Sequence, residues 1–156
     1  MTTSSHDSTR TGVFRLIAIL WFIWGAVHIL AGVMTLSSDT AKAVQGIADA
    51  VDPALLLDVT YPAAAGGVID QHGFNLLWFG VVTAVCAFFV WRGSMGALFI
   101  AALVGGLADV GYFVFIDLAG FAKFFPGTVM TIVSGTAIAA SLWVYWTGRG
   151  ASSPGG

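Results

Sequence analysis

Hydrophobic residues fill four long blocks of this 156-residue chain, and polar residues gather between and outside them. A helix that crosses a bilayer needs about 20 mostly apolar residues, and each block reaches that length. Membrane-spanning β-strands would instead give more numerous segments of ~10 residues with alternating polarity. Tyr61-Pro62 and Gly66-Gly67 are expected to break structure before the second block. The predicted transmembrane helices span residues 13–36, 71–91, 94–118 and 124–147.

The expected fold class is all-α: a polytopic membrane protein with one four-helix transmembrane domain over residues 13–147. Residues 1–12 and 148–156 are rich in small polar side chains without apolar periodicity, a pattern typical of disordered tails. Composition agrees with this class, because 58% of the residues are hydrophobic and 9% are charged, whereas an average soluble domain is about 25% charged.

The connection at residues 37–70 is long and carries a pattern of its own. Val44, Ile47 and Val51 recur at helical spacing, with polar residues turned elsewhere. One of residues 38–40 is expected to cap the start of this helix, and Pro53 to open a second short helical turn. The connection is interpreted as a short amphipathic segment that covers the outer face like a lid. The alternative is an interfacial loop that only connects two helices.

The basic residues predict the orientation. With four spans, all four arginines (residues 10, 15, 92 and 149) fall on one side, and both lysines fall on the other with most of the aspartates. Basic residues favour the cytoplasmic side, so we expect a multi-pass protein of the cell membrane with both termini in the cytoplasm. The alternative is that the first block is a cleaved leader ending near residues 41–43, although a leader's apolar core is shorter, at ~7–15 residues.

Five polar residues inside the spans fall at a similar depth. His28, Asn75, Asp109, Thr131 and Ser134 each lie thirteen to sixteen residues from the expected cytoplasmic end of their helix. Polar groups in hydrocarbon are costly and tend to mark function. The sequence therefore predicts a polar layer about two-thirds of the way across the membrane.

The layer is expected to face protein. Asp109 continues a row of small residues, spaced by four, that starts at Gly93, and such rows line helix contacts in membranes. His28 lies on a similar stripe of the first helix. A lone ionised carboxylate is strongly disfavoured in this environment, so we expect His28 to share a proton with Asp109 and Asn75 to add a hydrogen bond.

Further candidates border this layer. Tyr112 lies three residues after Asp109, His72 lies nearer the outer mouth, and Trp24 is interpreted as part of a ligand wall. Packing and interhelical hydrogen bonding are the alternatives for all of them. The predicted ligand-binding residues are Trp24, His28, His72, Asn75, Asp109, Tyr112 and Thr131.

The layer suggests three functions. The first is binding or handling of a small lipophilic or protonatable ligand, because ligand sites are common between the helices of a bundle. The second is a structural or assembly subunit, in which the polar layer only fixes helix register. The third is an enzyme in which His28 and Asp109 work as an acid–base pair, although no familiar hydrolase, phosphate-loop or zinc-protease motif is present and the catalytic residues are unknown.

The expected partners are the lipid bilayer and a small molecule, with a homo-oligomer as a further option. Nucleic acid is not expected, because the net charge is −2 and no long basic run exists. No metal ligands are predicted. Haem and copper stay open as cofactors. His28 and His72 differ in depth by about five residues, an awkward spacing for two haem ligands. Copper with Met34 or Met130 as an additional ligand is conceivable, but the spacing is unspecific.

The first helix carries Arg15-Leu16 followed by Gly25, His28 and Gly32, and three more spans follow. This layout resembles small bacterial DoxX-like membrane proteins. The resemblance covers mainly the first helix and the overall arrangement. It implies a four-helix fold, with some members linked to redox complexes, and it assigns no catalytic residue.

Overall fold

The computed structural model of the chain describes residues 3–150, with side chains from residue 9 to residue 147. Within that range every regular element is helical, so the all-α prediction is confirmed. Four segments are long and apolar enough to cross a membrane, at Thr9–Ser37, Ala63–Trp91, Met95–Asp117 and Phe124–Thr147, and the chain is a multi-pass membrane protein. The helices are α1 (Thr3–Ser37), α2 (Thr40–Ile47), α3 (Pro53–Leu57), α4 (Ala63–Trp91), α5 (Met95–Tyr112) and α6 (Val129–Gly150), with π-helical turns at Phe113–Asp117 and Phe124–Thr128.

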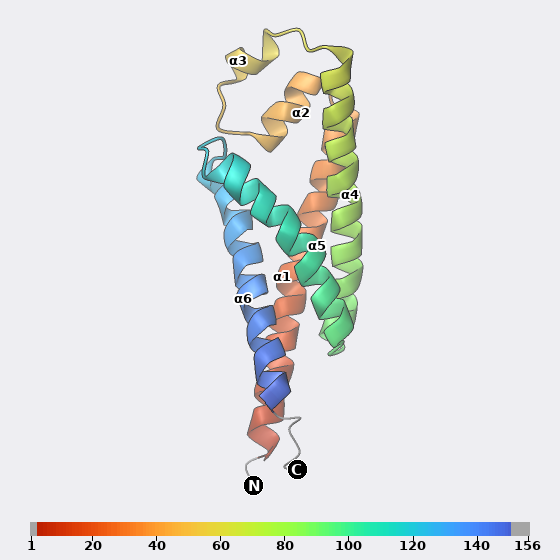
Figure 1. Ribbon diagram of the computed structural model, residues 1–156, viewed down its shortest axis with the longest axis vertical. Coiled ribbons are helices and arrows are strands. Elements are labelled where there is room, and N and C mark those ends of the chain that lie inside the picture. Colours follow the sequence, from red (N-terminus) through yellow and green to blue (C-terminus); the bar gives the residue numbers. More distant parts are fainter. Residues whose placement is uncertain (1–2, 151–156) are drawn as a thin grey trace.

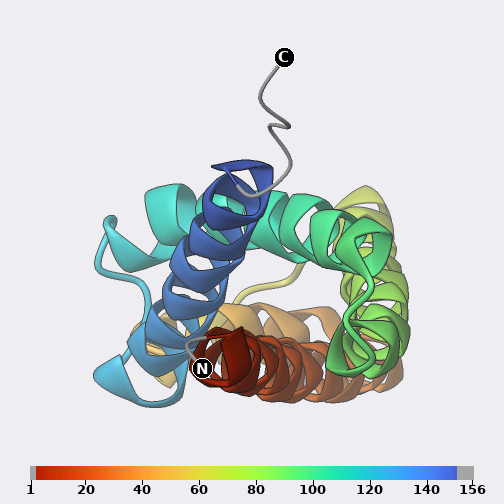
Figure 2. The ribbon, with the colours of Figure 1, turned by 90° about the horizontal axis from the view of Figure 1, so that it is seen from below.

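The four long helices form an elongated bundle (Figure 1). The start of α1 and the end of α6 lie at one end, and α2 and α3 lie at the other. Seen from the end that carries both termini, the helices follow one another around the bundle in the order α1, α4, α5 and α6 (Figure 2). Helix α5 crosses the bundle obliquely, from the lower end of α4 to the upper end of α6.

Glycines let α1 and α4 pack closely. A Cβ added to Gly25 would lie 2.8 Å from the backbone of Gly80 and Ala84, and one added to Gly32 would lie 2.5 Å from the backbone nitrogen of Leu77. No real Cβ fits at such distances, so these positions require glycine. Small residues promote close helix packing in membranes for this reason.

Large aromatic residues of α1 fill the centre of the bundle. Trp21 and Trp24 are fully buried, and Trp21 packs against Gly105 of α5 where a Cβ would lie 2.6 Å from its ring. The Trp21 indole N–H also donates a 3.4 Å hydrogen bond to the Ser141 hydroxyl on α6. The outer surface of the spans is instead covered by exposed large apolar side chains, as expected of a surface that faces lipid.

The connection between α1 and α4 contains the two short helices predicted from the sequence. Asp39 caps α2 by accepting a 3.0 Å hydrogen bond from the Lys42 backbone N–H. Asp52 caps α3 in the same way through Ala54, with Pro53 at the first helical position. A backbone bond from the Ala50 N–H to Phe121 and a bond from the Lys123 backbone N–H to the Asp49 carboxylate tie this connection to the loop between α5 and α6.

Two helices begin earlier than the sequence suggested. Helix α1 starts at Thr3 rather than at Val13, because extending an existing helix avoids the cost of nucleation. Helix α4 starts at Ala63 rather than at Gln71, directly after Pro62. Gly66 and Gly67 therefore lie inside the helix and do not break it, since the preceding alanines are strong helix formers. Of the predicted tails, residues 1–2 and 151–156 lie outside the described part of the chain.

The loop between α5 and α6 is less regular than predicted. Helix α5 ends at Tyr112, and the wider π-helical turn continues it to Asp117. The fourth span begins at Phe124 as expected, but Phe125 has extended backbone angles and regular α-helix starts only at Val129. Pro126 explains this difference, because the residue before a proline is disfavoured in helical conformation.

Candidate functional site

A cavity of about 320 Å³ lies beneath α2, between the halves of the long helices that are nearer to α2. Most of its wall is apolar, supplied by residues such as Val27 and Met34 of α1, Leu76 of α4 and Met130 of α6. Ligand sites are typically concave, mostly apolar and furnished with a few polar groups. This cavity has that character, and the predicted layer supplies part of its polar lining.

Asp109 is the most deeply buried charged residue that borders the cavity. Its side chain is 5% exposed and lies on the packed face of α5, as predicted from the row of small residues. The Trp24 indole N–H donates a 3.0 Å hydrogen bond to Oδ1, and the Ser134 hydroxyl donates to Oδ2. Helices α1, α5 and α6 therefore meet at this carboxylate.

His28 lies next to Trp24 and also borders the cavity. Its imidazole stacks on the indole with ring centroids 3.6 Å apart and planes inclined by 19°. Its Nδ1 lies 2.8 Å from the Trp24 carbonyl oxygen, which can only accept, so Nδ1 carries hydrogen. In the neutral ring, Nε2 is then the acceptor.

The expected direct pair between His28 and Asp109 is replaced by a chain through Trp24. The indole stacks on the imidazole and donates to the carboxylate, so one tryptophan joins the two residues. The indole N–H is a neutral donor, so it hydrogen-bonds to the carboxylate without any proton transfer between His28 and Asp109. Sequence reasoning missed this role. It placed Ser134 in the polar layer and Trp24 in the ligand wall, but Trp24 does not line the cavity.

Two more predicted residues border the same cavity. Tyr112 lies one helical turn beyond Asp109 on α5, and His72 is supplied by α4. The Tyr112 hydroxyl approaches Gly127, where an added Cβ would lie 2.8 Å from it. Four of the seven predicted residues therefore converge on one space: His28, His72, Asp109 and Tyr112.

Asn75 and Thr131 lie apart from that space. The Asn75 side-chain oxygen accepts a 3.2 Å hydrogen bond from the Trp78 indole on its own helix. Asn75 lies two residues after Gly73 on α4, so its side chain is rotated by about 200° around the helix from Gly73, which packs on α1. The Thr131 hydroxyl is buried and has no hydrogen-bond partner among the described residues. Neither residue lines the cavity.

The lid forms one wall of the cavity, on the side away from both termini. Lys42, Ala43, Gly46 and Ile47 of α2 line it, together with Asp49. Lys42 also forms an exposed 3.0 Å ion pair with Asp39. The amphipathic pattern of this segment predicted a lid, but it did not reveal which of its residues face the cavity.

Metal-binding chemistry has no obvious set of ligands in the described part of the chain. No group of three or more His, Cys or Asp side chains gathers there in a way that could hold a metal ion. The single cysteine, Cys86, is a buried free thiol within α4.

Comparison with known proteins found no matching family model, no matching curated protein and no matching solved structure. The resemblance to DoxX-like proteins therefore stays a prediction.

Proposed function

We propose that this protein binds a small, mostly apolar molecule in the cavity beneath α2, and that the ligand donates a hydrogen bond to Asp109. The observation that carries the proposal is a buried carboxylate that borders a cavity of ligand size and receives only neutral donors, Trp24 and Ser134, from the described side chains.

The volume favours a small ligand. Ligand pockets usually measure about 300–1,000 Å³, and this cavity lies at the lower end with about 320 Å³. The apolar wall suits a hydrocarbon or aromatic body. A protonated amine suits the Asp109 carboxylate best, because hydrogen bonds to charged groups are the strong ones.

A cell-membrane location with both termini in the cytoplasm is part of the proposal. Its support is the gathering of all four arginines at the end that carries both termini, where basic residues favour the cytoplasm. Fusing a reporter that works only in the cytoplasm to each terminus tests this orientation.

The binding experiment uses naphthylmethylamine as the probe, with the matched alcohol and carboxylic acid for comparison. Isothermal titration in detergent is expected to rank the amine first and the acid last. Binding of the acid with equal or higher affinity would contradict the proposed role of Asp109.

A space-filling variant tests the position of the site. Gly46 lines the cavity and has open space around its Cβ position, so Gly46→Leu is expected to reduce amine affinity at least tenfold without unfolding the protein. Gly67→Leu is the matched control, since that position is equally open and does not line the cavity. Equal binding by both variants would place the ligand elsewhere.

A further inference from the structure

Arginines and aromatic rings gather at the end of the bundle opposite the lid. Three arginines there lie over the faces of aromatic side chains, an arrangement that holds a guanidinium in place while its N–H groups stay available. The pairs are Arg10 with Phe14 at 6.0 Å, Arg15 with Trp91 at 5.4 Å and Arg92 with Phe88 at 4.2 Å, each measured to the ring centroid.

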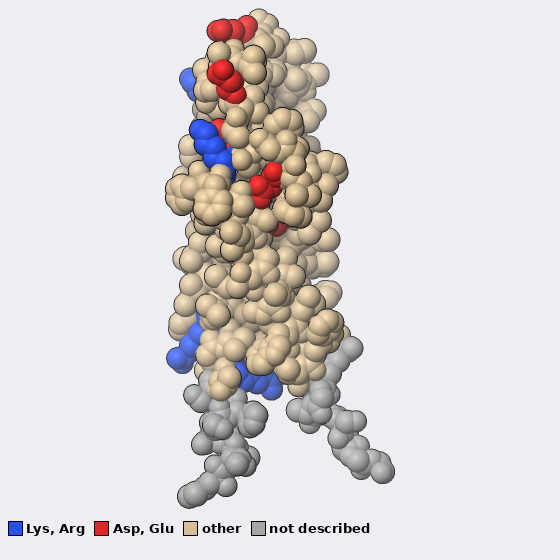
Figure 3. Space-filling view, turned by 90° about the vertical axis from the view of Figure 1, so that its left-hand side faces the viewer, with Lys and Arg blue, Asp and Glu red and all other residues tan. Residues whose placement is uncertain are grey.

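Carboxylates are scarce at this end. All eight acidic residues are aspartates. Asp7 is the one that the sequence places at this end of the bundle, and its side chain is outside the described part of the structure. The one ion pair among the described side chains joins Lys42 and Asp39, in the lid. Figure 3 shows one face on which acidic side chains lie only in the upper part, together with some basic ones, whereas the lower end carries basic side chains alone. Among the described side chains, no carboxylate therefore forms an ion pair with Arg10, Arg15 or Arg92.

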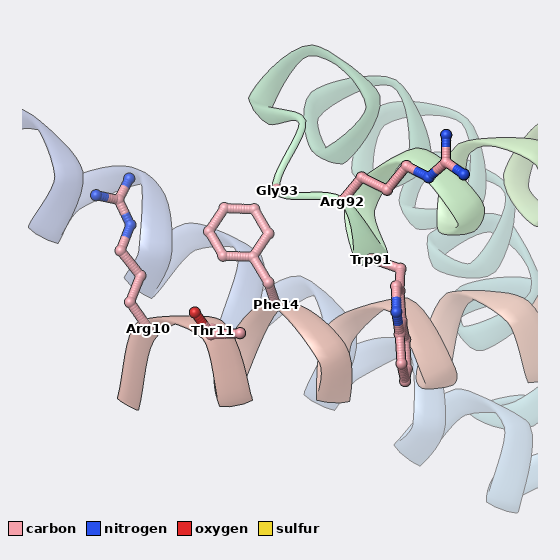
Figure 4. Close-up of a pocket in the computed structure, with 6 residues that line it drawn as sticks. All are labelled: Arg10, Thr11, Phe14, Trp91, Arg92 and Gly93. Atoms are coloured by element: carbon pink, nitrogen blue, oxygen red, sulfur yellow. The ribbon is translucent and has the colours of Figure 1, made fainter. Parts of the chain in front are cut away.

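The same end contains a pocket of about 330 Å³. The first turns of the α1 span and the turn between α4 and α5 line it, through Arg10, Thr11, Phe14, Trp91, Arg92 and Gly93. In Figure 4, Arg10, Thr11 and Phe14 extend from α1 to the same side, and Phe14 stands between Arg10 and the turn at Gly93. Arg10 and Arg92 lie at opposite sides of the pocket, and in Figure 4 their side chains extend away from each other.

The depth of the pocket favours a lipid over a soluble anion. It lies where the spans beginning at Thr9 and ending at Trp91 leave the apolar region. From Arg92, an exposed apolar stripe runs back along α4 toward the membrane centre, through Phe88, Val85 and Val81, which are 54%, 53% and 44% exposed. A phosphate held at the pocket would place its acyl chains along this stripe.

We propose that this pocket binds the phosphate headgroup of an anionic phospholipid. The recognised chemistry is a phosphate oxyanion, held by guanidinium groups that match its geometry. The Trp91 and Phe14 rings suit the headgroup level, where aromatic side chains are enriched. This site is separate from the cavity beneath α2, so each proposal can fail without the other.

Native mass spectrometry of the full chain in detergent tests the proposal. The probes are phosphatidylglycerol and phosphatidylcholine at equal concentration, with inorganic phosphate as a soluble competitor. We expect selective retention of phosphatidylglycerol that millimolar phosphate does not displace. Equal retention of the two lipids, or displacement by free phosphate, would overturn the lipid assignment.

Charge-matched variants locate the site. Arg10→Gln with Arg92→Gln is expected to weaken phosphatidylglycerol binding roughly 30-fold, given about 1 kcal/mol for each basic residue near a lipid surface. Lys42→Gln with Lys123→Gln removes the same charge from the opposite end and is expected to leave binding unchanged. Arg10→Lys with Arg92→Lys keeps the charge but loses the planar guanidinium, so it is expected to restore only part of the affinity. Equal losses in the arginine and lysine double variants would overturn the proposal.

Discussion

The Trp24 indole N–H donates a 3.0 Å hydrogen bond to the carboxylate of Asp109, 85 residues further along the chain. This bond joins α1 to α5 inside the bundle, and the Ser134 hydroxyl joins α6 to the same carboxylate. The same carboxylate borders the cavity beneath α2. Asp109 therefore holds three helices together and supplies the acceptor that we assign to a ligand.

Removing this acceptor is expected to destabilise the bundle. Asp109→Ala leaves the donors of Trp24 and Ser134 without a partner in an apolar interior, at about 1–3 kcal/mol for each stranded group. Asp109→Asn keeps an oxygen acceptor for Trp24, so its loss should be clearly smaller. Unfolding in detergent with increasing SDS measures the difference, and equal stability of the two variants would show that the hydrogen bonds contribute little.

The close packing of α1 on α4 predicts that a substitution at Gly32 lowers the stability of the protein. Gly32→Ala places a Cβ 2.5 Å from the Leu77 backbone nitrogen, so we expect a loss of about 1–3 kcal/mol from overpacking. Gly111→Ala is the matched control, because no atom lies within 4 Å of its Cβ position and it too lies in a span. The control is expected to be neutral or up to about 1 kcal/mol more stable. Similar unfolding curves for the two variants would contradict the packing.

The cap of α2 is expected to respond to acid. The Lys42 backbone N–H, and then the Lys42 ammonium, lower the pKa of the exposed Asp39 carboxyl below its ordinary value. A lowered pKa means that the cap stabilises α2 above the ordinary pKa and is lost as the pH falls through the lowered one. The Lys42 amide NMR signal should follow this titration. It should not titrate in Asp39→Asn, and a wild-type midpoint at or above the ordinary value would refute the cap.

The lid is expected to loosen when its attachment to the α5–α6 loop is cut. Asp49→Ala removes the acceptor of the Lys123 backbone N–H. Hydrogen exchange measured by mass spectrometry should then rise both in α2 and in the loop around Lys123. Asp58→Ala, at the end of α3, is the control and should leave the loop unchanged. Unchanged exchange in Asp49→Ala would mean that other contacts hold the lid closed.

The length of the apolar blocks and the hydrophobic periodicity predicted much of this fold. The four spans follow from the length of the apolar blocks, and α2 follows from the spacing of Val44 and Ile47. The burial of Asp109 follows from the row of small residues on α5, because such a row requires a neighbouring helix against it. These features depend on local sequence alone, which explains why they could be predicted from it.

The partners within the site were harder to predict. Depth counted along each helix treats the helices as parallel, but α5 crosses the bundle obliquely (Figure 1), so equal depth does not bring residues together. Asn75 was expected at the same depth as His28 and Asp109, but it does not line the cavity. The sequence pattern allows Trp24 to be either a packing residue or part of a ligand wall. It did not predict the hydrogen bond to Asp109, because the orientation of a single N–H donor leaves no trace in hydrophobic periodicity.

The most direct test of the proposed site is the effect of Asp109→Asn on binding of naphthylmethylamine and of the matched alcohol, measured by isothermal titration on protein that remains folded. Loss of the charged acceptor should weaken the amine about 10- to 100-fold, since hydrogen bonds to charged groups contribute about 1.5–3 kcal/mol. The alcohol should change much less. Unchanged amine affinity, or an equal loss for both probes, would contradict the assignment of Asp109 as the ligand's acceptor.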